Sequence, residues 1–173
     1  MTLTVTGITS AHGAWTTSSG PHVVTLGSDD GTTASGSSYS ICASPGRAIS
    51  GISMSNPTVA EGAIASITSV RFLGTGRCAS RGTLGVNLVI SFETPSGFSE
   101  TLNFFNNTNY EVEYGTTRTT QPDSSAWEYS DIEGLEFNML SGAGTIHLAY
   151  FAAEVTYVAA AVTDNATFFG ANF

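Results

Sequence analysis

The three histidines are the first residues of this chain whose chemistry could support a reaction. A hydrolytic triad needs a nucleophile, a general base and an acid that orients the base. His12, His22 and His147 fall on one expected loop and two expected strands, and no Gly-x-Ser-x-Gly elbow surrounds any serine. His147 lies in an apolar run, where a histidine is typically a core or interface residue. The sequence therefore predicts no catalytic residue, and we expect a protein that is not an enzyme.

Paired carboxylates are the second possible source of chemistry. Glu111 and Glu113 alternate with apolar residues, and Asp131, Glu133 and Glu136 surround a short helical pattern. A glycosidase needs two carboxyl groups that face each other across a cleft. Any two residues at i and i+2 of a strand share a face, so the Glu111/Glu113 spacing is weak evidence and favours a solvated strand face. We expect Asp131 to cap the short helix.

Metal and cofactor signals are equally weak. Asp29-Asp30-Gly31-Thr32 offers oxygen atoms, but it lacks the alternating ligands and the distal glutamate of a calcium-binding loop. No cysteine and histidine spacing is typical of zinc, and no glycine-rich loop has the strand–helix context that holds phosphate. We expect neither a metal nor a cofactor.

The charge balance excludes one large class of partner. The 173 residues carry a formal charge of −9, with five arginines and no lysine, and only 11% of residues are charged. Nucleic-acid binding needs clustered cations, which this chain lacks. The amino terminus lacks the basic and apolar regions of a signal peptide, and the run Leu148–Val162 is short for a membrane span and contains Glu154. We therefore expect no nucleic-acid partner and no membrane segment.

Two cysteines leave one possible bridge, which is too few for a disulfide framework. Cys42 lies in an apolar strand pattern, where cysteine acts as a small hydrophobic residue. Cys78 lies in the segment GTGRCASRGT between Arg77 and Arg81, which we interpret as a solvated turn with ion pairs at its rim. We expect two free thiols and assembly in a reducing cytoplasm, although the sequence does not decide whether the cysteines pair.

Alternating apolar residues predict a series of short strands with Gly, Ser and Pro turns between them. The clearest runs from Leu84 to Phe92 and returns through the turn at residues 94–97 into Phe98–Phe105, which predicts a hairpin. The other expected strands lie near residues 3–8, 22–26, 39–42, 49–54, 66–73, 110–114 and 146–158. Their number and spacing predict an all-β fold, a β-sandwich or jelly roll.

The stretch from Thr116 to Tyr157 is expected to organise this fold. A loop rich in Thr, Pro and Asp leads to Trp127, which we expect to be buried, and then to one short helix near residues 131–138 that closes an end of the sandwich. Ser141–Gly144 is typical of a hairpin turn. In the last strand the apolar face changes near Tyr150, so either both faces are buried or a β-bulge switches them.

The domain prediction is a single sandwich over residues 1–158 followed by a C-terminal tail, residues 159–173. The tail is too apolar for a disordered terminus and ends in Phe168, Phe169 and Phe173. Either it folds back on its own sandwich, or it is an assembly arm whose aromatic residues contact a neighbouring subunit.

Several of these spaced residues together resemble tailed-bacteriophage virion structural proteins. The resemblance is best in TTQPDSSAWEYSDIEGLEF and in the closing AEVTYV, and it also covers Gly13-Ala14-Trp15, Tyr39 and ITSVRF at residues 67–72. The matching positions of the best stretch are Pro122, Asp123, Trp127, Asp131, Ile132, Leu135, Glu136, Val155 and Tyr157. The chain departs from the family pattern at Asn138-Met139 and in its added tail.

The resemblance implies a non-enzymatic β-sandwich in many copies on a virion that is assembled in the host cytoplasm. The first hypothesis is a capsid decoration (cement) protein that forms trimers on the major capsid protein. The alternatives are a tail, connector or baseplate component, and a carbohydrate- or receptor-binding module. The expected structural anchors are Trp15, Trp127, Ile132, Leu135 and Tyr157, and the expected assembly contacts are Phe168, Phe169 and Phe173.

Overall fold

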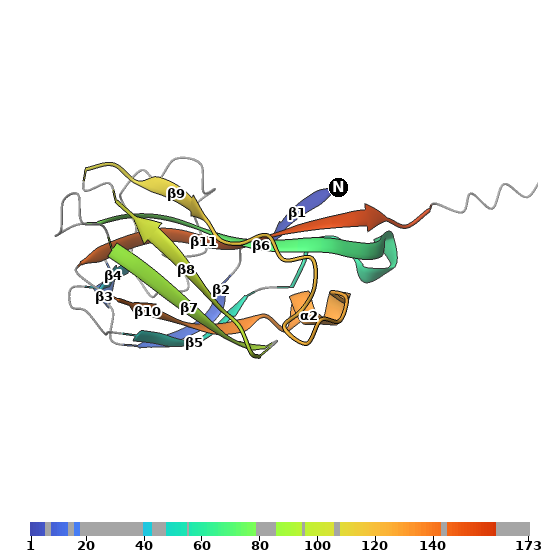
Figure 1. The fold of residues 1–173 in the computed structure, drawn as a ribbon, viewed down its shortest axis with the longest axis horizontal. Coiled ribbons are helices and arrows are strands. Elements are labelled where there is room, and N and C mark those ends of the chain that lie inside the picture. Colours follow the sequence, from blue (N-terminus) through green and yellow to red (C-terminus); the bar gives the residue numbers. More distant parts are fainter. Residues whose placement is uncertain are drawn as a thin grey trace, which may run out of the picture.

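A computed structural model gives the fold of the chain (Figure 1). It describes residues 1–5, 8–13, 16–17, 40–42, 48–54, 56–78, 86–94, 96–105, 108–142 and 145–161. The expected strand near residues 22–26, the Asp29–Thr32 turn, Trp15, His22, Arg81 and the tail phenylalanines lie outside these described residues.

The described residues form two antiparallel sheets that pack face to face (Figure 1). The first contains β3 (Thr16–Thr17), β4 (Ser40–Cys42), β11 (Ile146–Ala159), β6 (Ile64–Cys78) and β9 (Glu111–Tyr114) in that order, with β1 (Thr2–Val5) also paired to β11. The second contains β2 (Ile8–Gly13), β5 (Ala48–Met54), β10 (Glu136–Ser141), β7 (Val86–Thr94) and β8 (Ser99–Phe104) in that order. The predicted all-β sandwich is confirmed.

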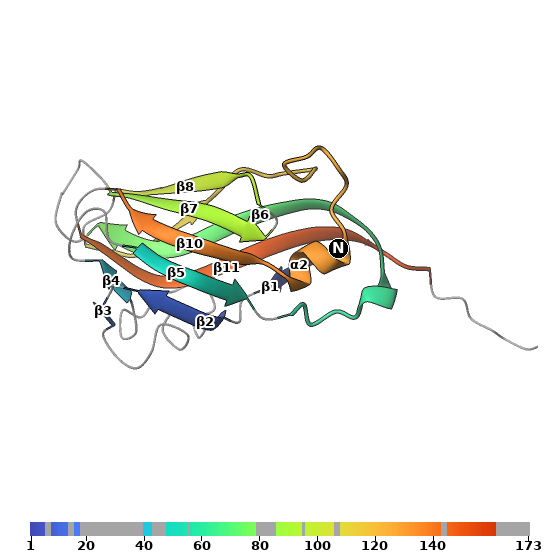
Figure 2. The same cartoon turned by 90° about the horizontal axis from the view of Figure 1, so that it is seen from below.

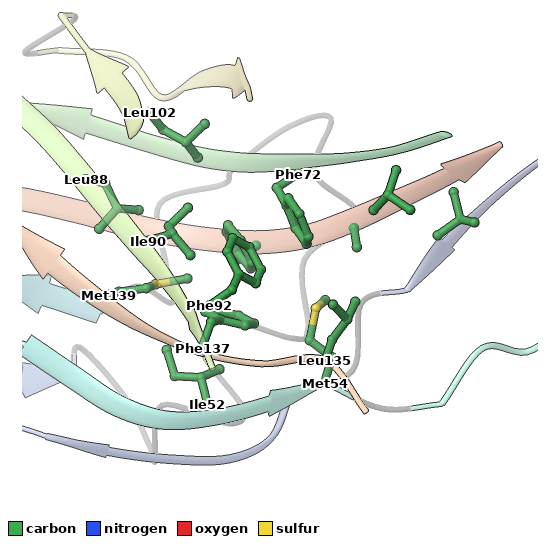
Figure 3. Packing of buried hydrophobic residues seen from close by; sticks show 14 of the residues in the cluster. Ile52, Met54, Phe72, Leu88, Ile90, Phe92, Leu102, Leu135, Phe137 and Met139 are labelled. Atoms are coloured by element: carbon green, nitrogen blue, oxygen red, sulfur yellow. The ribbon is translucent and has the colours of Figure 1, made fainter. Parts of the chain in front are cut away.

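Period-two patterning places the core between the sheets. On β7, Leu88, Ile90 and Phe92 are buried, while Asn87 and Ser91 are exposed. Figure 3 shows rings from both sheets meeting in this space, among them Phe72 of β6 and Phe137 of β10. The rings of Phe137 and Phe151, one from each sheet, have centroids 4.8 Å apart, which is a favourable aromatic spacing. The predicted β7–β8 hairpin is confirmed by its continuous register from Val86–Phe104 to Ser91–Ser99.

The last strand, β11, runs through the middle of its sheet as predicted, with β6 on one side and β4 and β1 on the other. Its register with β6 shifts between Leu148 and Tyr150, which makes Ala149 an extra residue. Leu148 therefore points into the main core, and after the bulge Phe151 and Val155 do so. Tyr150 and Ala152 belong to a second buried cluster. The sequence left open whether both faces of this strand are buried or a β-bulge switches them. Both occur in the structure.

The helix prediction over residues 131–138 is correct in kind and wrong in extent. The helix α2 spans Tyr129–Glu133 and ends at Gly134. The carboxylate of Asp131 accepts the Glu128 backbone N–H at 2.7 Å, so Asp131 does cap the helix, from its third position. Residues from Glu136 onward form β10, because Phe137 and Met139 are buried at alternate positions and continue the strand period.

Two turn predictions are corrected. Ser141–Gly144 does not close a hairpin, because β10 and β11 lie in different sheets and the chain crosses between layers there. Residues 74–78 are not a solvated turn but the end of β6, where Thr75 and Cys78 are buried and pair with β11. The glycines that suggested a turn serve close packing instead, since a Cβ on Gly76 would lie 2.9 Å from the carbonyl oxygen of His147.

The strand register also separates the two cysteines. Cys42 and Cys78 both pair with Ile146, from opposite sides of β11. Two interstrand spacings place their Cα atoms about 10 Å apart, beyond the reach of a disulfide. Cys78 is buried and is not part of a disulfide.

Beyond the helix end of the sandwich, β6 and β11 continue as a paired extension (Figure 2). The pairing reaches Ala159 and Ile64, next to the short 3-10 helix η1 (Glu61–Ala63). Within the described residues, no helix is long and apolar enough to cross a membrane.

Candidate functional site

The outer face of the six-stranded sheet carries the most distinct polar group among the described residues. Arg71 on β6 pairs across the strands with Glu154 on β11, and their side chains form an ion pair of 2.6 Å. The Arg71 guanidinium also lies 4.2 Å from the ring centroid of Tyr114 on β9. Tyr114 is 53% exposed, so this trio presents an aromatic ring, a cation and a carboxylate to solvent.

A second polar group lies at the other end of the same two strands. A terminal nitrogen of Arg77 lies 3.1 Å from Nδ1 of His147, its partner in register. Burial, and secondly the charge of Arg77, lower the pKa of His147 below its ordinary value. A neutral imidazole that accepts a hydrogen bond from the guanidinium fits this arrangement. This contact with Arg77 gives His147 a structural role on the outer face of the sheet.

Between these two groups the face is buried and mostly apolar, although it also contains Thr75. Leu73, Tyr150 and Ala152 are buried there, and Val112 of β9 packs against them. This cluster separates the Arg71 trio from the Arg77–His147 pair, so the two polar groups do not form one site.

One edge of the sandwich is closed by a buried glutamate. Glu100 of β8 is 8% exposed, and its carboxylate accepts the Thr116 backbone N–H at 3.0 Å and an Arg118 terminal N–H at 3.3 Å. A Cβ on Gly115 would lie 2.6 Å from Glu100 Cγ, so the glutamate is held against bare backbone. These contacts join the two sheets at the β8–β9 side and are structural.

The loop that follows is pinned by Trp127, as the sequence suggested. Its indole is 3% exposed and donates from Nε1 to the Arg118 carbonyl oxygen at 3.1 Å. Ile132 and Leu135 are each 1% exposed and Tyr157 is 8% exposed, which places all four described anchors in the main core.

Two grooves lie beside this helix end. A groove of about 300 Å³ separates residues 64–67 of β6 from residues 127–129 and is also lined by Glu61. Tyr129, on its wall, donates its hydroxyl to the Val59 carbonyl oxygen at 2.8 Å. Burial raises the pKa of Tyr129, with smaller contributions from the negative charges of Glu133 and Glu61. A second groove of about 650 Å³ is lined by Ser53, Met54, Asn56, Glu133, Gly134, Leu135 and Glu136.

The carboxylates considered in the sequence are dispersed. Glu111 and Glu113 are half-buried on β9, and burial, followed by the charge of Glu111, raises the pKa of Glu113. Asp131 is bonded within its own helix turn, and Glu133 and Glu136 line the larger groove. No group of three or more His, Cys, Asp or Glu residues that could hold a metal occurs in the part of the chain that the structure describes.

Sequence reasoning missed the Arg71–Glu154–Tyr114 trio. Alternation in residues 66–73 does place Arg71 on the outer face, and Glu154 is the one acid in an apolar run. The sequence does not reveal the strand register that brings β6, β9 and β11 together. Only the outward direction of each separate side chain could be predicted.

No protein-family model and no curated protein matches the chain. Among solved structures it is similar to the carbohydrate-binding module CBM6cm-2 of lichenase 5A from Cellvibrio mixtus, in complex with cellotriose, with 11% identity and a TM-score of 0.45 over 91% of this chain and 99% of that chain. It is also similar to the C-terminal CBM6 of LamC from Zobellia galactanivorans, with 13% identity and a TM-score of 0.46 over 90% of this chain and 99% of that chain. No ligand is inferred for this chain from likenesses of this degree.

Proposed function

We propose that this chain is a non-catalytic structural subunit of a bacteriophage virion that acts by binding its own copies and neighbouring virion proteins. The observation that carries the proposal is an open strand edge on the paired extension of β6 and β11. Residues 64–69 of β6 have no strand partner on the side away from β11 among the described residues. An open strand edge is a ready surface for pairing with another chain.

The resemblance to virion structural proteins, which is best in TTQPDSSAWEYSDIEGLEF and AEVTYV, supports the placement on a virus particle. The most specific form of the proposal is a capsid decoration protein, acting as a trimer on the major capsid protein. Its mechanism is mass action, because a subunit that binds the assembled shell but not the separated parts shifts the equilibrium toward the shell. The net charge of −9 supports a subunit that stays soluble until specific contacts form.

Copy number per particle tests this form of the proposal. Absolute quantification by mass spectrometry of purified particles that contain the chain should give hundreds of copies for a decoration protein. Tens of copies or fewer would favour the tail, connector or baseplate alternative. Absence from the particles would contradict the virion role.

Sugar binding is the second candidate function, and one observation favours it. Tyr114 exposes 53% of its surface beside the Arg71–Glu154 pair, and sugars are held by aromatic faces flanked by charged hydrogen-bonding groups. Binding on a glycan array, lost in Tyr114→Ala and retained in Phe105→Ala, would support it. Phe105 is a matched control because it is another exposed aromatic residue, at 57%. A chain that binds no glycan would exclude this candidate.

A further inference from the structure

The open edge of β6 is confined to one segment of the strand. Farther along β6, Leu73–Gly76 pair with β9, and Val70 forms a bridge with Arg118. Residues 64–69 pair with β11 on one side, and no described strand pairs with them on the other. Ala65, Ser66 and Thr68 are exposed. The edge therefore offers backbone donors and acceptors over about one typical strand length.

The sequence of this edge lacks the charges and prolines that usually protect an edge strand. Natural edge strands are blocked by charged residues, especially lysine, by proline or by a covering element. Residues 64–69 read Ile-Ala-Ser-Ile-Thr-Ser, with no charge and no proline. An unprotected edge of this kind fits a segment that is paired in the assembled state.

The groove of about 300 Å³ runs beside the same edge. Trp127, Glu128 and Tyr129 form one wall, residues 64–67 form the other, and Glu61 also lines the groove. In β-strand addition the edge supplies backbone hydrogen bonds, and adjacent pockets receive alternate side chains of the added strand. Trp127 is 3% exposed, so the partly exposed Tyr129 and Ile64 supply the surface against which an aromatic side chain can pack.

The C-terminal segment has the matching chemistry and begins at the same place. The Ala160 N–H donates to the Ala63 carbonyl oxygen at 2.9 Å, two residues from Glu61 at the groove. The chain beyond it reads AVTDNATFFGANF and contains a single charge, Asp164. Extended, this segment reaches roughly 40 Å. In an extended strand Phe169 and Phe173 fall on the same face, since successive side chains alternate.

We propose that the C-terminal segment of one copy, residues 162–173, adds as a strand to the β6 edge of a second copy, with the Phe169 face toward the Trp127–Tyr129 groove. Pairing with a second copy is favoured because β11 points away from its own sandwich at its end (Figures 1 and 2). To reach its own β6 edge, the segment has to reverse around η1. This inference rests on the proposed function, since it requires that copies of the chain meet.

Photo-crosslinking of the full-length chain tests the contact. The probe p-benzoylphenylalanine is introduced in place of Phe169, and equal amounts of light and isotope-labelled chain are mixed before irradiation. We expect crosslinked peptides that join a light and a heavy copy, with the probe attached within residues 64–67 or 127–129. Crosslinks within one copy only, crosslinks elsewhere or no crosslinks would overturn the proposal.

A matched pair of variants separates this contact from assembly in general. Ala65→Arg places a long charged side chain at the groove, and Ser91→Arg places it on β7, a strand that already has a partner on both sides. Both residues are exposed, so neither change disturbs the core. We expect Ala65→Arg to reduce the intermolecular crosslink at least tenfold and Ser91→Arg to leave it unchanged. Oligomers that persist undiminished in Ala65→Arg would refute the edge contact and leave the structural role intact, whereas a chain that never self-associates would refute both.

Discussion

Arg71 and Arg118 make the same kinds of contact in different surroundings. Each lies over an aromatic ring, Arg71 at 4.2 Å from the centroid of Tyr114 and Arg118 at 4.6 Å from that of Phe98. Each also pairs with a glutamate. The Glu154 side chain is 29% exposed, while that of Glu100 is 9% exposed. Water screens the Arg71–Glu154 pair more than the Arg118–Glu100 pair. Because Glu100 is the more buried glutamate, Arg118 contributes more to the free energy of unfolding than Arg71 does.

We therefore predict that Arg118→Met lowers the free energy of unfolding by about 2–4 kcal/mol, because Glu100 loses its charged partner while buried. Arg71→Met serves as the control and should cost at most about 1 kcal/mol. Urea denaturation of the two variants and the parent chain measures both values. Equal losses would show that burial does not control these pairs.

His147 makes stability depend on pH in a defined direction. Its pKa is lowered in the folded chain, first by burial and second by Arg77, so the folded state binds this proton less readily than the unfolded state. Stability from the neutral imidazole is thus present above about pH 6.5 and is lost as the pH falls through that value toward the lower folded pKa.

For this reason we expect His147→Gln to flatten the pH dependence of the melting temperature between about pH 8 and about pH 5. Circular dichroism melts of the two proteins across this range provide the comparison. Parallel curves would mean that another group causes the acid sensitivity.

At the scale of elements, sequence patterning predicted strands better than it predicted connections. The alternation of β7 and β8 followed directly from one buried face each, as Leu88 and Leu102 illustrate. Ile132 and Leu135 share a helix-like spacing, yet Gly134 ends the helix between them and Leu135 already accepts a backbone hydrogen bond from Met54. A three-residue spacing cannot reveal where a helix stops, because the tertiary hydrogen bond decides it.

The bulge in β11 is the element on which both buried faces depend. Ala149 is the extra residue that lets Leu148 and Phe151 point into the same core. Deletion of Ala149 removes the switch, so one half of the strand must turn its apolar side chains away from the core.

We predict that this deletion abolishes the cooperative thermal transition, because a one-residue slip reverses every side chain on one side of it. Deletion of Ala161, an exposed residue just after β11, is the control and should leave the transition in place. Circular dichroism melts report both results. A cooperative transition in the Ala149 deletion would mean that the register shift is not required.

At the scale of the molecule, composition favours some partners over others, and the structure adds where contact can occur. With five arginines and no lysine among 173 residues, we expect no nucleic-acid partner. The open edge at residues 64–69 could not be predicted, since whether a strand has one neighbour or two depends on the pairing of distant segments such as β9 and β11. The groove beside Trp127 depends on the same long-range packing.

The molar mass of the full-length chain in solution tests the self-association at the centre of this account most directly. Size-exclusion chromatography with light scattering, over a range of concentrations, distinguishes the 17.9 kDa monomer from its multiples. We predict a whole-number multiple of the monomer mass, with the trimer as the expected species, and a shift toward monomer in Ala65→Arg. A mass of 17.9 kDa at every concentration would contradict the account.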